Sequence, residues 1–393
     1  MIKKNKEIIA CFIDEIYYKK GQKYVSKYVS GNFLKILYKE TNWDIAFILP
    51  VKKNQHIVSY STELQGDRVI IELLPGWDSV VSYYKFLANP FNYLKLRSRI
   101  KKLVRKYNFF WIRLPSPFGL WLGKEVEKAN KLALYHVAGD IRLAYLSQKY
   151  KRFKFFAKIM GKYFHYRSLK LGKNGVFLTT GSVLFNDYKK ANKRVIPFID
   201  SLVREHELIE PNKEISVPIK FLYVGNFSEN KGVFFLISAV EKLRKKYCTE
   251  LNIVGFGEDE EKIYKISKEK KFIKLHGFIP HGERLTEIYR ECDIFVLPSL
   301  YYEGFPRVIL EAWANGLFVI ASEVGGIKGI GKDGVNLLFF KPGDECDFIR
   351  KVEVLLEEPN VRERLRQGIR DIQREITAEH MIKKIKEIIK RRK

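Results

Sequence analysis

Two carboxylates, Glu303 and Glu311, stand with seven residues between them and a Gly-Phe-Pro turn directly after the first. The pattern that follows predicts one helix over 308–314, beginning at that turn. A helix N-terminus presents free backbone N–H groups, where a phosphate or a developing negative charge can bind. Glu311 projects from the same region, about two turns beyond Glu303. The spacing therefore suits a ligand with a diphosphate at one end and sugar hydroxyls at the other.

A cation that could bind the same diphosphate lies upstream. The segment 221–232 predicts a buried strand that ends at Gly225-Asn226, and Lys231-Gly232 follows in a loop. Lys231 can place its charge on a diphosphate while nearby N–H groups hold the oxygens. The run 292–299 predicts a second buried strand before Glu303, and open α/β sheets bind ligands at such carboxyl ends. The alternative is that Lys231 is only a solvated loop lysine and that Glu311 is only an exposed helix glutamate.

A series of motifs resembles the retaining nucleotide-sugar glycosyltransferases of family 4. The resemblance covers roughly residues 218–393, and it is much weaker over residues 1–200. The matching segments are 221–232, 251–257, 273–279, 303–316, 319–327 and 342–344. Three positions depart from the family pattern: Asn226 stands in place of a common arginine, Phe318 in place of proline, and 328–331 in place of Pro-Glu.

The resemblance implies an α/β chain of the GT-B fold. Two Rossmann-like domains with doubly wound parallel sheets would face a central cleft, and the C-terminal helix would cross back to the N-terminal domain. We expect an acceptor-binding domain over 1–205, a nucleotide-sugar-binding domain over 206–376 and a basic helix over 377–393. The polar stretch 205–218 with its two prolines is the expected linker.

The resemblance also implies roles for individual residues. Glu311 would bind the ribose hydroxyls, for which a carboxylate is suited because it accepts two hydrogen bonds at once. Glu303 would lie near the donor sugar, either as a nucleophile or as a binding group. The implied donor-binding residues are Gly225, Asn226, Lys231, Gly255, Gly277, Phe278, Gly304, Phe305, Pro306, Arg307 and Glu311.

The N-terminal half offers candidates at the ends of predicted strands. His136 and Asp140 follow one strand and join Glu303 and Lys231 as catalytic candidates, although a lone histidine at a strand end is more often structural. The acceptor-side candidates are Tyr17, Gly21, Tyr24, Arg113 and Ser116. No D-x-D pair occurs near a strand end, so we expect no metal and no cofactor. Lys231 and backbone N–H groups would bind the diphosphate in place of a metal.

Alternating elements predict a parallel sheet in this half. The expected strands are 6–13, 44–50, 109–113, 132–137 and 175–179. The strand over 175–179 is expected to be the final strand of this half. A Tyr/Lys loop over 15–24 and a helix over 25–39 are expected between the first two.

Composition restricts the partners. The net charge is +27, and residues 1–210 alone hold 39 Lys/Arg against 17 Asp/Glu, whereas 211–380 are nearly neutral. Such a basic half attracts a polyanion, either anionic lipid or nucleic acid.

The four cysteines are scattered, with Cys11 and Cys292 in apolar runs, which indicates free thiols in a reducing compartment. No run is long enough to cross a bilayer, and no secretory signal is seen. We therefore expect a cytoplasmic protein, peripheral at the inner face of the plasma membrane.

The segment 151–167 predicts a helix with lysines 151, 154, 158 and 162 on one side and Phe153, Phe156, Met160, Tyr163 and Phe164 on the other. It could lie in a membrane interface, or dock its aromatic side chains on its own core.

The sequence thus favours a retaining glycosyltransferase whose donor is a uridine-linked rather than a guanosine-linked sugar. Its acceptor would be a lipid-linked or glycan acceptor of bacterial capsule, exopolysaccharide or O-antigen. The alternatives are a glycosyltransferase acting on nucleic acid, and a non-catalytic membrane- or nucleic-acid-binding protein that keeps the fold.

Overall fold

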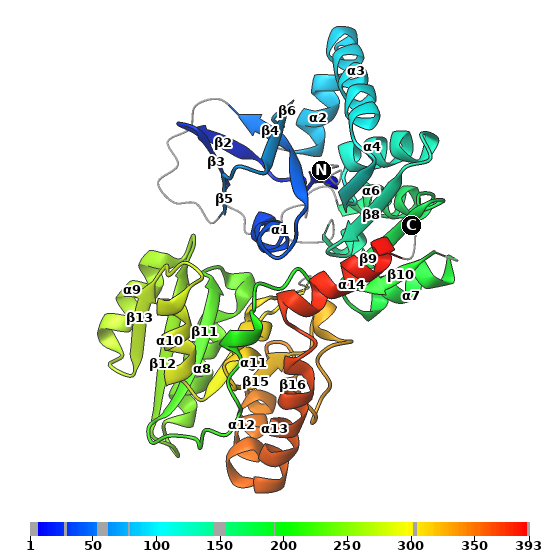
Figure 1. The fold of residues 1–393 in the computed structure, drawn as a ribbon. Helices are drawn as coiled ribbons and strands as arrows, with labels where there is room; N and C mark the ends of the chain where they lie inside the picture. The colour runs from blue at the N-terminus through cyan, green and yellow to red at the C-terminus, as the bar shows by residue number, and fades with distance from the viewer. Residues whose placement is uncertain are drawn as a thin grey trace. The chain divides into compact units, whose positions relative to one another are not determined.

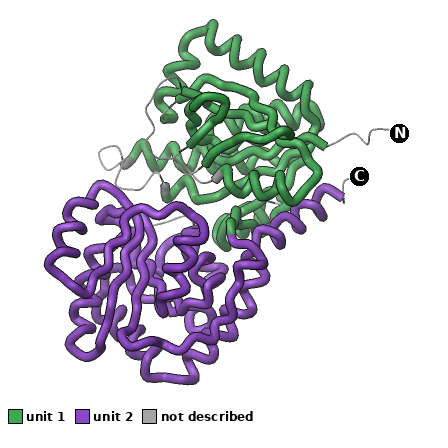
Figure 2. Tube along the Cα trace, turned by 60° about the vertical axis from the view of Figure 1, so that its left-hand side comes forward, with its two compact units in different colours: residues 1–202 green, residues 203–393 purple. Residues whose placement is uncertain are grey.

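The computed structural model describes residues 7–26, 30–52, 62–77, 79–144, 154–191, 193–301 and 305–390 of the chain. The chain divides into two compact units, unit 1 over residues 1–202 and unit 2 over residues 203–393 (Figure 2). This division precedes the expected boundary after residue 205, and the C-terminal helix is grouped with unit 2. Each unit has its own sheet and its own buried core.

Unit 1 is built on a mostly parallel sheet with strand order β10-β9-β8-β7-β1-β4, and β6 pairs with β4 (Figure 1). The chain passes from β1 to β4 and β6 on one side, then returns to add β7 on the other side of β1. The strand order therefore reverses between β1 and β7, as in doubly wound sheets. The strands are β1 (Ile8–Phe12), β4 (Asp44–Lys52), β6 (Val69–Pro75), β7 (Phe109–Leu114), β8 (Leu132–Val137), β9 (Gly175–Thr179) and β10 (Val195–Pro197).

Short strands extend this sheet where the sequence predicted a loop and the start of a helix. β2 (Tyr17–Lys20) and β3 (Lys23–Ser26) form an antiparallel hairpin, and β3 pairs with β5 (Thr62–Leu64). Gly21 lies in the tight turn with a φ of 61°, a conformation that favours glycine. The predicted loop 15–24 and the predicted helix start at 25 are therefore wrong, and α1 covers Ser30–Lys39. The prediction of β9 as the last strand is also wrong, because β10 pairs with it.

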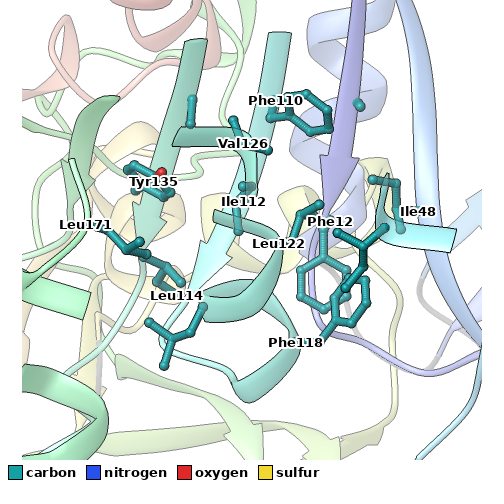
Figure 3. Close-up of a cluster of buried hydrophobic side chains, with 14 of the residues drawn as sticks. Phe12, Ile48, Phe110, Ile112, Leu114, Phe118, Leu122, Val126, Tyr135 and Leu171 are labelled. Carbon is teal, nitrogen blue, oxygen red and sulfur yellow. The ribbon is translucent and has the colours of Figure 1, made fainter. Parts of the chain in front are cut away.

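Helices cover the sheet of unit 1 and close its core. Figure 3 shows Phe12, Phe110 and Ile112 from the sheet packed against Phe118 and Leu122 of α4. Phe12 and Phe118 meet with ring centroids 4.8 Å apart. The remaining helices of unit 1 are α2 (Val80–Leu87), α3 (Pro90–Lys106), α4 (Pro117–Lys128), α5 (Ile141–Ala144), α6 (Lys154–Leu169) and α7 (Ser182–Lys190).

Unit 2 holds a fully parallel sheet with the order β13-β12-β11-β14-β15-β16 (Figure 1). Its strand order reverses between β11 and β14, which pair at Phe221↔Ile294. The predicted helix over 308–314 is confirmed as α11. The strands are β11 (Ile219–Asn226), β12 (Thr249–Phe256), β13 (Ile273–Gly277), β14 (Ile294–Leu297), β15 (Phe318–Ser322) and β16 (Leu338–Phe340).

Seven α-helices accompany that sheet in the described part of unit 2. They are α8 (Val233–Leu243), α9 (Glu260–Glu269), α10 (Glu283–Glu291), α11 (Val308–Ala314), α12 (Glu345–Glu357), α13 (Pro359–Gln373) and α14 (Ala378–Lys390). Residues 205–218, the expected linker, already belong to this unit. Gln373 of α13 donates hydrogen bonds to the carbonyls of Ile209 and Trp313, 2.7 and 2.8 Å away, and so joins this segment to α11.

Candidate active site

The reversal point of the unit 2 sheet brings together the loops that follow β11 and β14. The N–H of Leu300 donates to the carbonyl of Asn230 over 2.9 Å. Gly232 has a φ of 71°, and a Cβ there would overlap the carbonyl oxygen of Pro298. Lys231, beside this contact, is half-buried in the short 3-10 turn Glu229–Lys231. The predicted cation thus lies on a loop that is fixed to the segment leading into α11.

Glycines keep the adjacent strand ends free of side chains. A Cβ at Gly255, the end of β12, would overlap the carbonyl oxygen of Gly225 in β11. A Cβ at Gly257 would overlap the carbonyl oxygen of Phe227. Asn226 ends β11 with an exposed side chain. The predicted donor residues Gly225, Asn226 and Gly255 therefore form a flat backbone surface at the crevice where doubly wound sheets bind ligands.

Two exposed aromatic side chains mark the outer side of this surface. Phe256 ends β12, and Phe278 follows β13. Their ring centroids are 5.0 Å apart at 82°, an edge-to-face pair. Gly277 has a φ of 69°, which turns the chain at this point, and the space around it is open. Phe278 is thus half-exposed and available to a planar ligand, as the sequence predicted for a base.

Glu311 of α11 is held by two residues around α10. Tyr289 donates its hydroxyl proton to Oε2 over 2.9 Å, and the Nδ1 of His281 lies 3.4 Å from Oε1. Burial alone would raise the pKa of Glu311. The hydrogen bond and positive charge of His281 and the hydrogen bond from Tyr289 outweigh the effect of burial, so the pKa of Glu311 is lowered. The hydrogen bond from Glu311 likewise raises the pKa of His281. The carboxylate is therefore ionised and oriented.

His281 and Tyr289 are functional candidates that were missed from the sequence. His281 follows the Gly277-Phe278 motif by a few residues, and that proximity is the one signal for it. Tyr289 carries no comparable signal in the sequence.

Residues at the start of α11 complete this region. Phe305 and Arg307 are half-buried, and Pro306 is buried. Arg307 carries a positive charge close enough to Glu311 to contribute to its lowered pKa. Glu303 and Gly304, predicted to lie near the donor sugar, fall outside the described residues.

A second set of polar residues lies at the reversal point of the unit 1 sheet, between β1 and β7. Arg113, near the end of β7, places Nη1 3.3 Å from Oε1 of Glu15, which follows β1. Ser116 accepts a hydrogen bond from the N–H of Gly119 and so caps α4. Asp14 adopts a φ of 53°, a conformation that costs energy for an L-residue and is concentrated at functional sites. Arg113 and Ser116 were predicted, whereas Asp14 and Glu15 were missed although they directly follow the first strand.

The other predicted residues of unit 1 are mostly enclosed. His136 is 3% exposed, and its ring packs edge-on against Trp111 and Phe198. Asp140 is also 3% exposed, and both of its oxygens accept hydrogen bonds from Arg142. These surroundings favour the structural alternative for both. Their catalytic roles stay predictions.

The hairpin carries the remaining acceptor-side candidates. Tyr17 is fully buried, whereas Gly21 at the turn is exposed and Tyr24 is half-buried. Burial raises the pKa of Tyr17 well above its ordinary value.

The described residues contain neither a metal-binding cluster nor a membrane-spanning helix. No three or more His, Cys, Asp or Glu side chains among them gather closely enough to hold a metal ion. In the same residues no helix combines the length and the apolar character needed to cross a bilayer. Cys11 and Cys292 are buried and all four cysteines are free, as predicted.

Comparison with known sequences places the strongest similarity in unit 2. Residues 205–371 match the family model described as glycosyl transferases group 1. An uncharacterized glycosyltransferase of Methanocaldococcus jannaschii is 34% identical over 146 residues, 36% of this chain and 37% of that protein. The lipopolysaccharide core biosynthesis glycosyltransferase LpsE of Rhizobium meliloti is 30% identical over 36% of this chain and 41% of its own. These matches span less than half of each relative. Protein CapJ of Staphylococcus aureus is 27% identical over 82% of this chain and 81% of its own.

Comparison with solved structures extends over nearly the whole chain. Sucrose-phosphate synthase of Thermosynechococcus elongatus has a TM-score of 0.69 at 18% identity, with 98% of this chain and 99% of that chain covered. HepE of Anabaena in complex with UDP has a TM-score of 0.65 at 14% identity, over 98% and 99% of the two chains. The predicted GT-B fold class is thereby confirmed.

Proposed function

We propose that this chain, whose residues 205–371 match the family model of glycosyl transferases group 1, is a retaining glycosyltransferase that uses a nucleotide sugar. In the proposed reaction the bond between the anomeric carbon and the diphosphate breaks, and its electron pair leaves with the nucleoside diphosphate. An acceptor oxygen then bonds to that carbon with retention of configuration. Stabilising the charge on the leaving diphosphate is the largest demand of such a reaction.

One observation carries the proposal: the loop that holds Lys231 meets the segment after β14 at the reversal point of the unit 2 sheet. The loop of Lys231 is hydrogen-bonded to the segment after β14, and α11 with Glu311 follows that segment. Lys231 would bind the diphosphate together with free N–H groups. Glu311, ionised and oriented by His281 and Tyr289, would accept hydrogen bonds from the ribose diol.

We propose a uridine diphosphate sugar as the donor. The solved structure of HepE carries UDP, which supports this choice. In our chain the base would rest against Phe278 and Phe256, whose pairing leaves both rings about half-exposed. Glu303 would contact the donor sugar. We expect the reaction to proceed without a metal, because Lys231 supplies the positive charge, and EDTA treatment of the enzyme tests this.

We propose that the acceptor binds at the reversal point of unit 1. Arg113, Glu15 and Ser116 offer donors and acceptors of hydrogen bonds at the edge where such sheets hold ligands. A lipid-linked or glycan acceptor of bacterial surface polysaccharide is proposed from two relatives. These are named for lipopolysaccharide core and for amylovoran biosynthesis. Such a reaction would take place on the cytoplasmic side of the plasma membrane.

A ligand-binding experiment tests the donor site. We expect UDP to raise the unfolding temperature of the protein in a thermal-shift assay. Lys231→Ala should weaken UDP binding by about tenfold or more while leaving uridine binding unchanged, since a charge-assisted bond contributes roughly 1.5–3 kcal/mol. Glu311→Ala should weaken both ligands. Lys265→Ala and Glu261→Ala, an exposed pair on α9, serve as matched controls.

Turnover distinguishes an enzyme from a binding protein. Slow hydrolysis of a uridine diphosphate sugar without acceptor should be measurable and should disappear in Lys231→Ala and Glu311→Ala. UDP binding without any hydrolysis or transfer would favour the non-catalytic alternative. Equal effects of Lys231→Ala on UDP and uridine would contradict the role assigned to the lysine.

A further inference from the structure

Large apolar side chains lie exposed together on three helices of unit 1. Phe91 is 82% exposed, Phe155 72% and Phe156 68%. We call the whole set the aromatic–basic face; it comprises Val81 and Tyr84 of α2, Phe91 and Leu94 of α3, and Phe155, Phe156, Ile159, Tyr163 and Tyr166 of α6. In the described part of unit 2, apart from the pair of Phe256 and Phe278, the exposed large hydrophobic side chains are instead single residues on different elements, such as Tyr264 and Val217.

α6 has its large side chains on the outside. Its buried side includes the small residues Ala157, Gly161 and Ser168 beside Phe164 and His165, and Met160 and Leu169 pack partly against the core. A Cβ at Gly161 would lie 3.0 Å from the Cα of Arg142, which shows how closely α6 packs on α5. An ordinary surface helix does the reverse and buries its large apolar residues.

The predicted faces of this helix are therefore corrected. Phe164 is buried and Met160 half-buried, whereas Phe156 and Tyr163 are exposed beside Lys158 and Lys162. Phe153 and Lys151 lie outside the described residues.

The helices of the face form one continuous layer. α2 contacts α3, α3 contacts α4, and α4 contacts α6. Tyr84 of α2 lies close enough to Tyr163 and Arg167 of α6 for their charges to influence its pKa. Arg167 donates a hydrogen bond of 2.7 Å to the Tyr163 hydroxyl. The exposed side chains of α2 and α6 are therefore neighbours.

The charge around this face has a single sign. Residues 79–124 and residues 141–186 each contain ten Lys or Arg and no Asp or Glu. Glu72 pairs with Arg99 and Lys106 at the base of α3, and Asp187 pairs with Arg142. Lys158 and Lys162 of α6 lie among the exposed aromatic side chains. Large apolar groups interleaved with exposed lysines are complementary to an anionic membrane surface.

We propose that the aromatic–basic face docks on a bilayer of anionic lipid. Phe91, Phe155 and Phe156 would enter the boundary between headgroups and acyl chains, while the lysines of α3 and α6 would pair with lipid phosphates. Aliphatic Ile159, Leu94 and Val81 favour lipid over nucleic acid, because a nucleic-acid surface offers no apolar interior for them. The proposal does not depend on the proposed sugar transfer.

Flotation of the full chain with lipid vesicles tests the proposal. We expect it to bind vesicles that contain phosphatidylglycerol and to bind phosphatidylcholine vesicles far more weakly. Phe91→Ser with Phe155→Ser should lower binding by about tenfold or more, since each phenylalanine would lose its apolar contact with lipid. Lys158→Gln with Lys162→Gln should also lower it about tenfold, and added salt should have a similar effect.

Matched variants on unit 2 separate the face from bulk properties. Tyr264→Ser with Val217→Ser removes two exposed apolar groups of unit 2, and Lys265→Gln with Lys268→Gln removes the same charge. These controls should leave vesicle binding unchanged, and circular dichroism should show all variants folded. Equal losses in the controls, or no binding by the native chain, would overturn the proposal.

Two further results would overturn it in favour of another occupant. One is tighter binding to duplex DNA than to anionic vesicles at matched salt, unaffected by the phenylalanine changes. The other is a native dimer that these changes convert to a monomer without altering vesicle binding.

Discussion

At the scale of single residues, Gly232 is the position where the candidate donor site depends most directly on backbone geometry. Gly232→Ala combines a left-handed φ with overlap on the Pro298 carbonyl. We expect a loss of about 2–4 kcal/mol in the stability of unit 2, together with weaker UDP binding. Gly277→Ala has a similar φ in open space and should cost only about 1–2 kcal/mol. Urea unfolding of both variants measures the difference, and equal losses would show that the carbonyl contact is unimportant.

The pair of His281 and Glu311 gives a pH-dependent contribution to stability. The pKa of His281 is raised, so its contribution is complete below the unfolded value near 6.5 and is lost as pH rises through the folded value. The pKa of Glu311 is lowered, so its contribution is lost only as acid takes pH below the ordinary carboxyl range. His281→Gln should therefore destabilise the protein by roughly 1 kcal/mol or less near pH 6, allowing for solvent screening, and hardly at all near pH 9. Unfolding curves at both pH values measure this, and a constant difference would contradict it.

The positions of single residues could be predicted where a motif follows a strand directly, whereas their functional roles stay predictions. Gly255 lies near the end of β12, Phe278 follows β13 and Lys231 lies in the turn after β11, because the strands before them are unambiguous apolar runs. His281 and Glu15 were missed because their roles come from partners distant in sequence, Glu311 and Arg113. Such pairings depend on strand order, which a single sequence does not contain.

At the scale of elements, a partly buried ionic cluster joins α5 to α7. Arg142 bonds to Asp140 and to Asp187, each at 2.6 Å. Arg142→Met would leave the enclosed Asp140 without its cation, so we expect a loss of about 3–5 kcal/mol in unit 1. Thermal unfolding measures the loss. A change under 1 kcal/mol would show that the cluster is not structural.

The same cluster provides a test of the predicted role of Asp140. If the carboxylate is structural, Asp140→Asn should lower the unfolding temperature and leave kcat unchanged at low temperature. If it acts in catalysis, kcat should fall while stability hardly changes.

Element prediction failed where tertiary contacts override local pattern. The Tyr17–Lys20 and Lys23–Ser26 strands are too short for a periodic signal, and β2 exists because it pairs with the end of β4. β10 has three residues and is defined by its pairing with β9. Longer buried strands such as Leu132–Val137 were predicted to the residue because both faces are apolar.

At the scale of the whole molecule, two separate cores predict two unfolding transitions. UDP at about one hundred times its Kd should stabilise unit 2 by roughly 2.7 kcal/mol and leave unit 1 unchanged. Calorimetry measures both transitions. Trp313 is the only tryptophan of unit 2, so fluorescence follows mainly unit 1 and identifies its transition. Equal shifts of both transitions would contradict a donor site confined to unit 2.

The fold class was predictable from the chain because alternating strands and helices, together with the ordered motifs of the second half, allow few other architectures. The basic excess of residues 1–210 was likewise visible in composition. The exposure of large aromatic side chains among the lysines was not visible, because it depends on the packing of α6.

The glycines beneath the candidate donor site have a consequence for attempts to redesign the enzyme. At Gly232, Gly255 and Gly257 any side chain would collide with a neighbouring main-chain oxygen, so these three positions accept no engineered side chain. Changes aimed at the proposed donor should therefore be made at Asn226 and Phe278, which are exposed, and at His281, which is partly so. Libraries confined to those three positions should retain folding far more often than libraries that include the glycines.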